Sequence, residues 1–206
     1  MKNPVDSKMT SRDRRKLKLK AEIRRQAYRL FSEQGYAKTS VEEIAAASDI
    51  SYSTFFRYFP NKQAIAVDLR FDALFIETLE SQPRQVSLGV AILNTAKALP
   101  NLLSPQDIAE MREHYVLLMR IPELQATGFA YLNTTAKLLA ETIKERVGNT
   151  DQSDLAIQSL AWSIVASWVA GFHYWIAHPD SELPGVVYEA LQGAIASAEL
   201  LAIRFA

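Results

Sequence analysis

The sequence predicts an all-α protein in which an amino-terminal three-helix domain, built around a helix-turn-helix, precedes a larger helical domain. Apolar residues recur at helical spacing in successive segments, and glycines, prolines and capping residues separate these segments. No segment alternates between apolar and polar residues as a half-buried strand does. The expected organisation is a flexible basic tail over residues 1–15, the helix-turn-helix domain over 16–64 and the larger domain over 65–206.

The first predicted helix has one apolar face and a glycine at its end. Its apolar residues follow the 3.6-residue repeat of an α-helix, whereas three arginines lie off that stripe. Gly35 is expected to end the helix, because glycine adopts a left-handed backbone without steric cost. The residues of the stripe are Leu19, Ile23, Ala27, Leu30 and Phe31.

Two short helices joined by a tight turn are expected next. Ser40 and Glu43 have the spacing of a capping box, in which each side chain caps the backbone of the other residue. Ser48 and Asp49 interrupt this helix, and Ser51 is a second candidate N-cap only two residues later. This arrangement predicts a helix-turn-helix.

The rest of the chain predicts further helices, about nine in all. Asn61 is a candidate cap for a helix that continues to about Glu80. Prolines and polar, glycine-containing segments then separate five more apolar-periodic segments. Those segments are Val86–Leu99, Pro105–Ile121, Glu123–Val147, Leu155–Ala177 and Pro184–Phe205.

The segment Leu155–Ala177 has no charged residue and is long enough to cross a membrane. Serines and a histidine dilute its apolarity, so a helix buried in a protein interface is the preferred interpretation and a membrane span the alternative. The chain has no cysteine, which fits a reducing compartment, and its first residues do not resemble a secretory signal. We therefore expect a cytoplasmic protein that does not bind a membrane.

The charges are unevenly distributed along the chain. Residues 1–64 hold 14 Lys and Arg against 7 Asp and Glu, whereas the remaining residues hold 9 against 16. A basic amino-terminal part suggests an anionic partner such as nucleic acid or a membrane surface. The alternative is a solvated basic tail, since much of the excess lies between Arg12 and Lys20.

The second helix of the predicted pair has the two faces of a DNA reader. Helical spacing places Phe55 and Phe59 on one side and Ser53, Thr54 and Arg57 on the other. One arginine side chain can donate hydrogen bonds to both the O6 and the N7 atom of a guanine. Serine and threonine hydroxyls can form hydrogen bonds with either type of base. The alternative is an ordinary amphipathic helix whose polar face meets only water, but the tight turn and the basic segment favour DNA binding.

The segment AEIRRQAYRLFSEQGYAKTSVEEIAAASDISYSTFFRYFPNKQAI resembles the amino-terminal DNA-binding domain of the TetR family of bacterial transcriptional regulators. The resemblance rests on the basic leading helix, LFSEQGYAKTSVEEIA, the two-helix element and FRYFPNKQA at matching spacings. Phe56 departs from the family pattern, because a tyrosine that contacts phosphate commonly holds that place. The resemblance implies base or phosphate contacts at Thr39, Ser40, Ser51, Tyr52, Ser53, Thr54, Tyr58 and Lys62.

The resemblance also implies a homodimer whose last two helices form a four-helix interface, and hence a palindromic operator in double-stranded DNA. The most direct expectation is a repressor that a small-molecule effector releases from this operator. An apolar stripe with small residues beside it independently marks the last helix as an interface. The expected interface residues are Trp168, Leu191, Ala194, Ala198, Leu201 and Phe205.

The middle helices carry the candidate effector site. In MREHYVLLMRIPEL, arginines could receive a carboxylate or phosphate while apolar residues line a cavity. Alternatively, the arginines pair with nearby glutamates at the surface and the methionine packs in the core. The candidate residues are Arg112, His114, Tyr115, Met119 and Arg120.

Two other classes of function remain as alternatives. An enzyme is disfavoured because the three histidines lack metal-ligand spacing and neither a G-x-S-x-G elbow nor a glycine-rich phosphate loop occurs. We therefore expect no catalytic residues, no cofactor and no metal. A helical protein-interaction module that has kept the helix-turn-helix shape is the other alternative. The identity of the effector, the operator sequence and the target genes cannot be read from the sequence.

Overall fold

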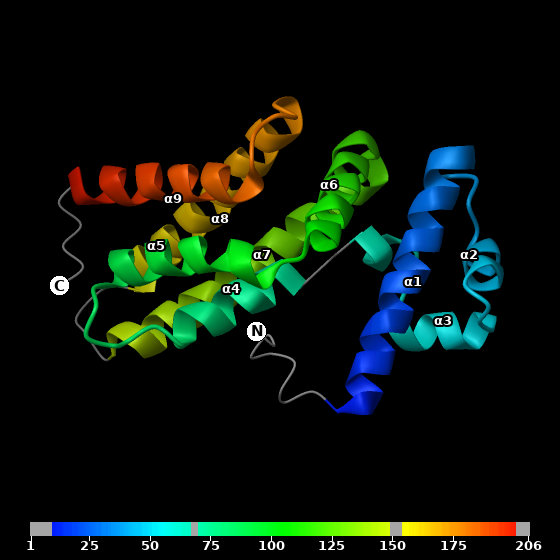
Figure 1. Ribbon diagram of the computed structural model, residues 1–206, viewed down its shortest axis with the longest axis horizontal. Coiled ribbons are helices and arrows are strands. Elements are labelled where there is room, and N and C mark those ends of the chain that lie inside the picture. Colours follow the sequence, from blue (N-terminus) through cyan, green and yellow to red (C-terminus); the bar gives the residue numbers. More distant parts are fainter. Residues whose placement is uncertain (1–9, 67–69, 149–153, 201–206) are drawn as a thin grey trace. The chain divides into compact units, whose positions relative to one another are not determined.

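The structure of the protein, a computed structural model, describes residues 10–66, 70–148 and 154–200 (Figure 1). These described residues form helices and no strand, which confirms the all-α prediction. The α-helices are α1 (Ser11–Gln34), α2 (Val41–Ala47), α3 (Tyr52–Tyr58), α4 (Arg70–Glu80), α5 (Leu88–Ala98), α6 (Pro105–Arg120), α7 (Pro122–Val147), α8 (Asp154–Ala177) and α9 (Leu183–Leu200).

The chain divides into two compact units. The first combines residues 1–68 with residues 113–128, and the second combines residues 69–112 with residues 129–206. The sequence predicted one boundary, after residue 64. The structure differs in that residues 113–128 belong to the amino-terminal unit. Residues 11–15, which were expected to belong to a flexible tail, are the first residues of α1 instead.

The core of the first unit confirms the inward faces predicted from the sequence. Ile23 and Ala27 of α1, Ile44 of α2 and Phe55 of α3 are fully buried, and Phe59 is nearly so. Leu117, Leu118, Ile121 and Leu124, from the end of α6 and the start of α7, join the same core. Sequence periodicity could not reveal this addition, because it connects segments far apart in the chain.

Two residues with positive φ shape the turns of the first unit. Gly35 ends α1 with a φ of 88°, as predicted. Asp49 lies in the turn between α2 and α3 with a φ of 54°, a conformation that Asp and Asn adopt more readily than most residues. The expected capping box of Ser40 and Glu43 is also present, because each side chain accepts a hydrogen bond from the other's backbone N–H.

The segment predicted as one helix from Asn61 to Glu80 begins with a 3-10 helix and ends with an α-helix in the described residues. The Asn61 side chain does accept a hydrogen bond from the backbone N–H of Ala64, at 2.8 Å. This cap precedes a short 3-10 helix, η2 (Gln63–Ala66), and α4 covers Arg70–Glu80, while residues 67–69 lie outside the described residues. A second 3-10 helix, η3 (Leu99–Leu102), extends α5. The bounds predicted for α6, α7 and α8 differ from the observed ones by one residue or less.

The second unit is a helical bundle in which α9 packs along α8 and against α5, while α5 also packs on α4 (Figure 1). Trp168 of α8 lies at its centre, edge-on to Phe71 and Phe75 of α4. By length and composition α8 is the one described helix that could cross a membrane, with a mean hydropathy of 1.5. Its buried side chains pack in this core, so the same composition also suits a buried helix.

We predict that Gly35→Ala lowers the free energy of unfolding by about 1–2 kcal/mol. A Cβ at this position would meet no atom within 4 Å, so the cost would arise from the positive φ alone. The control is Gly185→Ala in α9, where a Cβ is equally free of contacts and φ is not positive. Because alanine is the better helix former, this control is expected to stabilise the protein slightly. Urea denaturation of both variants tests the difference, and equal effects would contradict the prediction.

Candidate nucleic-acid interface

The seven-residue helix α3 is capped at its start and anchored on one side. Ser51 is its N-cap, and its hydroxyl oxygen accepts a hydrogen bond from the backbone N–H of Thr54 at 3.1 Å. The Ser51 hydroxyl also lies 3.0 Å from the hydroxyl of Ser53 and donates to the hydroxyl of Thr54 at 2.9 Å. Because Phe55 and Phe59 are buried, these hydroxyls lie on the outward side of the helix.

The outward side of α3 combines polar and aromatic groups. Ser53 and Arg57 are exposed, and Thr54 and Tyr58 are half-buried. The Arg57 guanidinium lies 5.5 Å from the centre of the Tyr58 ring. Tyr52 is also exposed. The structure thus brings together on one short helix the residues that the sequence predicted to contact bases.

Thr39 and Ser40 precede α2, where the sequence predicted phosphate contacts. Thr39 is 2% exposed, and its hydroxyl donates to the carbonyl oxygen of Gly35 at 2.9 Å. Ser40 is more accessible, although its hydroxyl takes part in the capping box with Glu43. The hydrogen bonds from the Ser40 backbone and hydroxyl lower the pKa of the Glu43 carboxyl. Of the two predicted residues, only Ser40 leaves its side chain partly open to a ligand.

Lys62 has an internal role that the sequence did not reveal. Its ammonium group donates to the carbonyl oxygens of Tyr36 and Thr39, at 2.7 and 2.8 Å, and lies 4.1 Å from the centre of the Tyr36 ring. Burial lowers the pKa of Lys62, while the negative charge of Glu123 opposes this shift. Two of the three N–H donors of the lysine are therefore engaged by the turn between α1 and α2.

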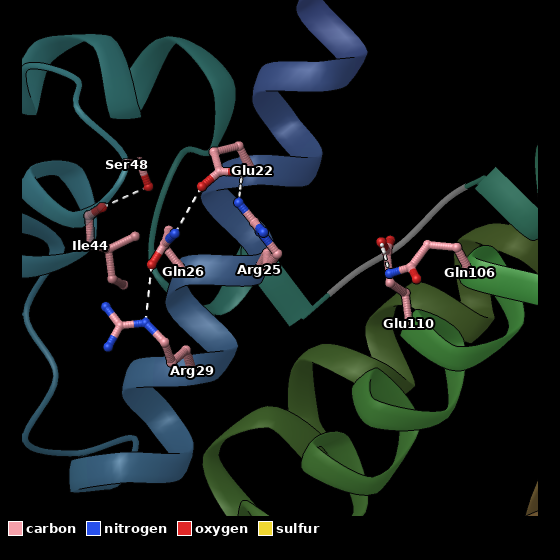
Figure 2. A network of polar contacts seen from close by, with 8 residues as sticks. All are labelled: Glu22, Arg25, Gln26, Arg29, Ile44, Ser48, Gln106 and Glu110. Carbon is pink, nitrogen blue, oxygen red and sulfur yellow. Dashed lines mark hydrogen bonds and ion pairs between the residues drawn. The ribbon is translucent and has the colours of Figure 1, made fainter.

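Two exposed arginines of α1, Arg25 and Arg29, have acidic or amide partners on the same helix (Figure 2). Arg25 pairs with Glu22, which also accepts a hydrogen bond from Gln26 at 2.8 Å. Arg29 donates to the side-chain oxygen of Gln26 at 3.1 Å and to Glu33 at 2.8 Å. The hydrogen bond from Gln26 is the main reason that the pKa of Glu22 is lowered. These exposed pairs compensate part of the positive charge that suggested an anionic partner.

The candidate effector residues lie in both units and in different surroundings. Arg112, in the second unit, donates to the carbonyl oxygen of Trp175 at 2.7 Å and lies 4.7 Å from the ring of that tryptophan. His114, in the first unit, is hydrogen-bonded to the hydroxyl of Tyr28. Burial raises the pKa of Tyr115 to about 12. The two remaining candidates, Met119 and Arg120, are exposed. Met119 therefore does not pack in the core.

The residues predicted for the dimer interface are only partly at the surface. Trp168 and Leu191 are 3% and 0% exposed in the core of their own chain, and Ala194 is half-buried. The side chains of Ala198, Leu201 and Phe205 lie outside the described residues. The surface of α8 instead presents another row of uncharged residues at helical spacing, which is formed by Ser159, Ser163, Ala166 and Ala170.

Two polar features of the second unit were missed by sequence reasoning. Asp72 accepts hydrogen bonds from the hydroxyl of Thr135, at 2.6 Å, and from that of Tyr131. The indole N–H of Trp168 is buried and has no hydrogen-bond partner among the described residues. A lone aspartate within the apolar run FDALF was the available signal for the first feature, whereas nothing in the sequence marked the second.

Comparisons with known proteins agree with this arrangement. The profile of the bacterial regulatory proteins of the tetR family matches residues 23–69, and that of the MftR C-terminal domain matches residues 87–197. A Mycobacterium tuberculosis protein named as a mycofactocin biosynthesis transcriptional regulator, MftR, is 25% identical over 73% of this chain and 76% of its own length.

Solved structures share the fold. The complex of SmeT with triclosan has a TM-score of 0.59 and 17% identity, covering 87% of this chain and 90% of SmeT, a repressor from Stenotrophomonas maltophilia. FadR of Thermus thermophilus, a TetR-family repressor in complex with lauroyl-CoA, has a TM-score of 0.50 and 22% identity, covering 85% and 93%.

The two matching profiles together span both the helix-turn-helix and most of the helices that follow it. The first profile includes the second half of α1 together with α2 and α3, and α3 carries the candidate base-reading residues. The chain therefore belongs to the TetR family of bacterial regulatory proteins and is a DNA-binding transcriptional regulator.

Proposed function

We propose that the protein is a homodimeric, cytoplasmic repressor that binds a palindromic operator and leaves it when a small molecule binds the second unit. The observation that carries this proposal is the arrangement of α3. Its two buried rings fix the helix to the core, and Ser53 and Arg57 extend outward beside Thr54. A short, firmly anchored helix with such side chains fits the major groove of B-DNA.

The side chains of α3 divide into those suited to bases and those suited to phosphates. Arg57 can donate hydrogen bonds to both the O6 and the N7 atom of a guanine. The hydroxyls of Ser53 and Thr54 can form hydrogen bonds with either type of base. Ser40 and Tyr58, at the rim, carry hydroxyls that can hold phosphates and so set the register of the protein on the duplex. We assign Lys62 mainly to positioning α2, because two of its donors already bind backbone carbonyls.

We assign the dimer interface to the uncharged, exposed row of α8 together with α9. Ser159, Ser163, Ala166 and Ala170 follow one another at spacings of three or four residues, so they share one face of the helix. Small side chains on such a face let a second helix approach closely, and the absence of charge avoids a desolvation cost. A two-fold symmetric dimer would present two copies of α3 to two half-sites, about one DNA turn apart.

We assign the effector site to the second unit, near Trp168 and Arg112. The buried indole N–H of Trp168 lacks a partner among the described residues, and the Arg112 guanidinium lies on another buried tryptophan. A buried indole donor without a described partner, together with a guanidinium beside an aromatic ring, suits an apolar molecule that carries an oxygen acceptor. The ligands in the SmeT and FadR structures, triclosan and lauroyl-CoA, both combine apolar and oxygen-bearing parts.

The proposal is tested by mixing the full-length protein with random genomic fragments at moderate salt and sequencing those that are retained. Enrichment of one palindromic site is expected, and the absence of any enriched site would refute the proposed function. A screen for compounds that raise the melting temperature then identifies effectors, because a ligand that binds only the folded state stabilises it. A true effector must also release the protein from the enriched site.

We predict that Arg57→Ala relaxes sequence preference at one base pair of each half-site by about 1–3 kcal/mol. Arg25→Ala is the control, because Arg25 is exposed on α1 and already paired with Glu22. It should leave the preference unchanged. Binding to the enriched site and to a panel of single-base variants measures the effect. The assignment of Arg57 fails if the substitution weakens cognate and random DNA equally.

Lys62→Met is expected to lower the free energy of unfolding by about 1–3 kcal/mol, because two hydrogen bonds from a charged donor to the turn are lost. The slope of log K against log salt should stay the same, since phosphate contacts are not removed. Thermal denaturation and binding at several salt concentrations measure the two quantities. A slope that falls by about one unit would instead establish the phosphate contact predicted from the sequence.

Ala166→Glu is predicted to convert the dimer to a monomer, because it would bury an unpaired carboxylate in the proposed interface. The control is Ala109→Glu, at another exposed alanine, on α6. This control should leave the oligomeric state unchanged. Sedimentation of both variants distinguishes the outcomes, and a fully dimeric Ala166→Glu protein would place the interface elsewhere.

A further inference from the structure

The reading helix carries two exposed aromatic rings that the hydrogen-bonding scheme for DNA does not use. Tyr52 is 51% exposed and Phe56 is 40% exposed, and they are one helical turn apart on α3. Large apolar rings on a surface that otherwise presents hydroxyls and a guanidinium need an apolar partner to leave water. Phe56 has no polar atom, so it can bind neither a phosphate oxygen nor a donor or acceptor on a base edge.

Phe56 is also held in a defined orientation. Its ring is edge-on to Tyr52, with centroids 4.9 Å apart and planes at 71°, and edge-on to Phe55, at 5.3 Å and 80°. Phe55 is fully buried, so it fixes one side of the Phe56 ring to the core. A ring that is already positioned loses little conformational entropy when it contacts a ligand.

Phe56 lies among the residues proposed to read bases. It follows Ser53 by three residues, which places the two side chains on neighbouring parts of the helix surface, and it directly precedes Arg57. The surface around the ring is therefore continuous with the proposed major-groove face. In that groove the C5-methyl group of thymine is the apolar group that base pairs display, and phenylalanine is among the side chains that contact it.

We propose that Phe56, supported by Tyr52, recognises the C5-methyl group of one thymine in each operator half-site. This inference rests on the proposed DNA-binding function and deepens it, because it assigns a specificity-determining residue to a position without a hydroxyl. A contact between Phe56 and deoxyribose is the competing possibility. Such a contact would not depend on the methyl group, so removing the methyl distinguishes the two.

The test uses the full-length protein and the operator enriched from genomic fragments. Each thymine of the site is replaced singly by deoxyuridine, which lacks only the methyl group. Replacement at one thymine per half-site is expected to weaken binding by the wild-type protein roughly fourfold, the equivalent of one buried methyl. Phe56→Ala should bind the thymine and deoxyuridine operators equally, whereas Phe56→Leu, which keeps an apolar side chain, should retain part of the difference.

Phe129→Ala is the matched control, because Phe129 is an exposed phenylalanine, on α7 in the second unit. Its ratio of thymine to deoxyuridine affinities should equal that of the wild type, whatever its absolute affinity. Melting curves verify that each variant is folded. If Phe56→Ala does not fold, Phe56→Leu tests the inference alone, and its ratio of thymine to deoxyuridine affinities should be smaller than that of the wild type. The inference is overturned if no deoxyuridine weakens wild-type binding, or if the variants at position 56 keep the full ratio. A protein that enriches no DNA site overturns the proposed function as well.

Discussion

The proposed DNA-reading surface depends on the burial of one ring, that of Phe55. With seven residues, α3 is too short to persist in water by itself, because the first turn of a helix is unfavourable to form. Phe55 and Phe59 enter a core shared with Ile23 of α1 and Ile44 of α2. Removing a buried phenylalanine costs about 3–5 kcal/mol, whereas an N-cap such as Ser51 contributes about 1 kcal/mol. Packing therefore fixes α3, and its outward residues can serve recognition.

The turn between α1 and α2 shows how the same residue types can serve structure instead of recognition. Hydroxyl and ammonium groups before and after a helix-turn-helix are suited to phosphate, yet Thr39 and Lys62 direct theirs to backbone carbonyls of this turn. Arg24 likewise donates to the carbonyl of Ile65 at 3.2 Å, although it belongs to the basic segment. Part of the positive charge of the amino-terminal segment thus stabilises the first unit.

Local patterns predicted the features that depend on neighbours in the chain. The end of α1 at Gly35, the Ser40 capping box and the inward rings of α3 follow from spacing alone. The rest depends on contacts between distant segments, such as Lys62 with the turn and residues 113–128 with the first unit. Trp168 is a different case, because α8 is apolar nearly all round and so its sequence does not reveal which side faces the core.

The self-paired arginines of α1 bear on how the protein would search a chromosome. Attraction to DNA of any sequence grows with the number of counter-ions that the protein releases from the phosphates. Arg25 and Arg29 already hold Glu22 and Glu33, so a phosphate gains little from them without displacing a carboxylate. These two pairs therefore lower the contribution that α1 can make to binding that is independent of sequence.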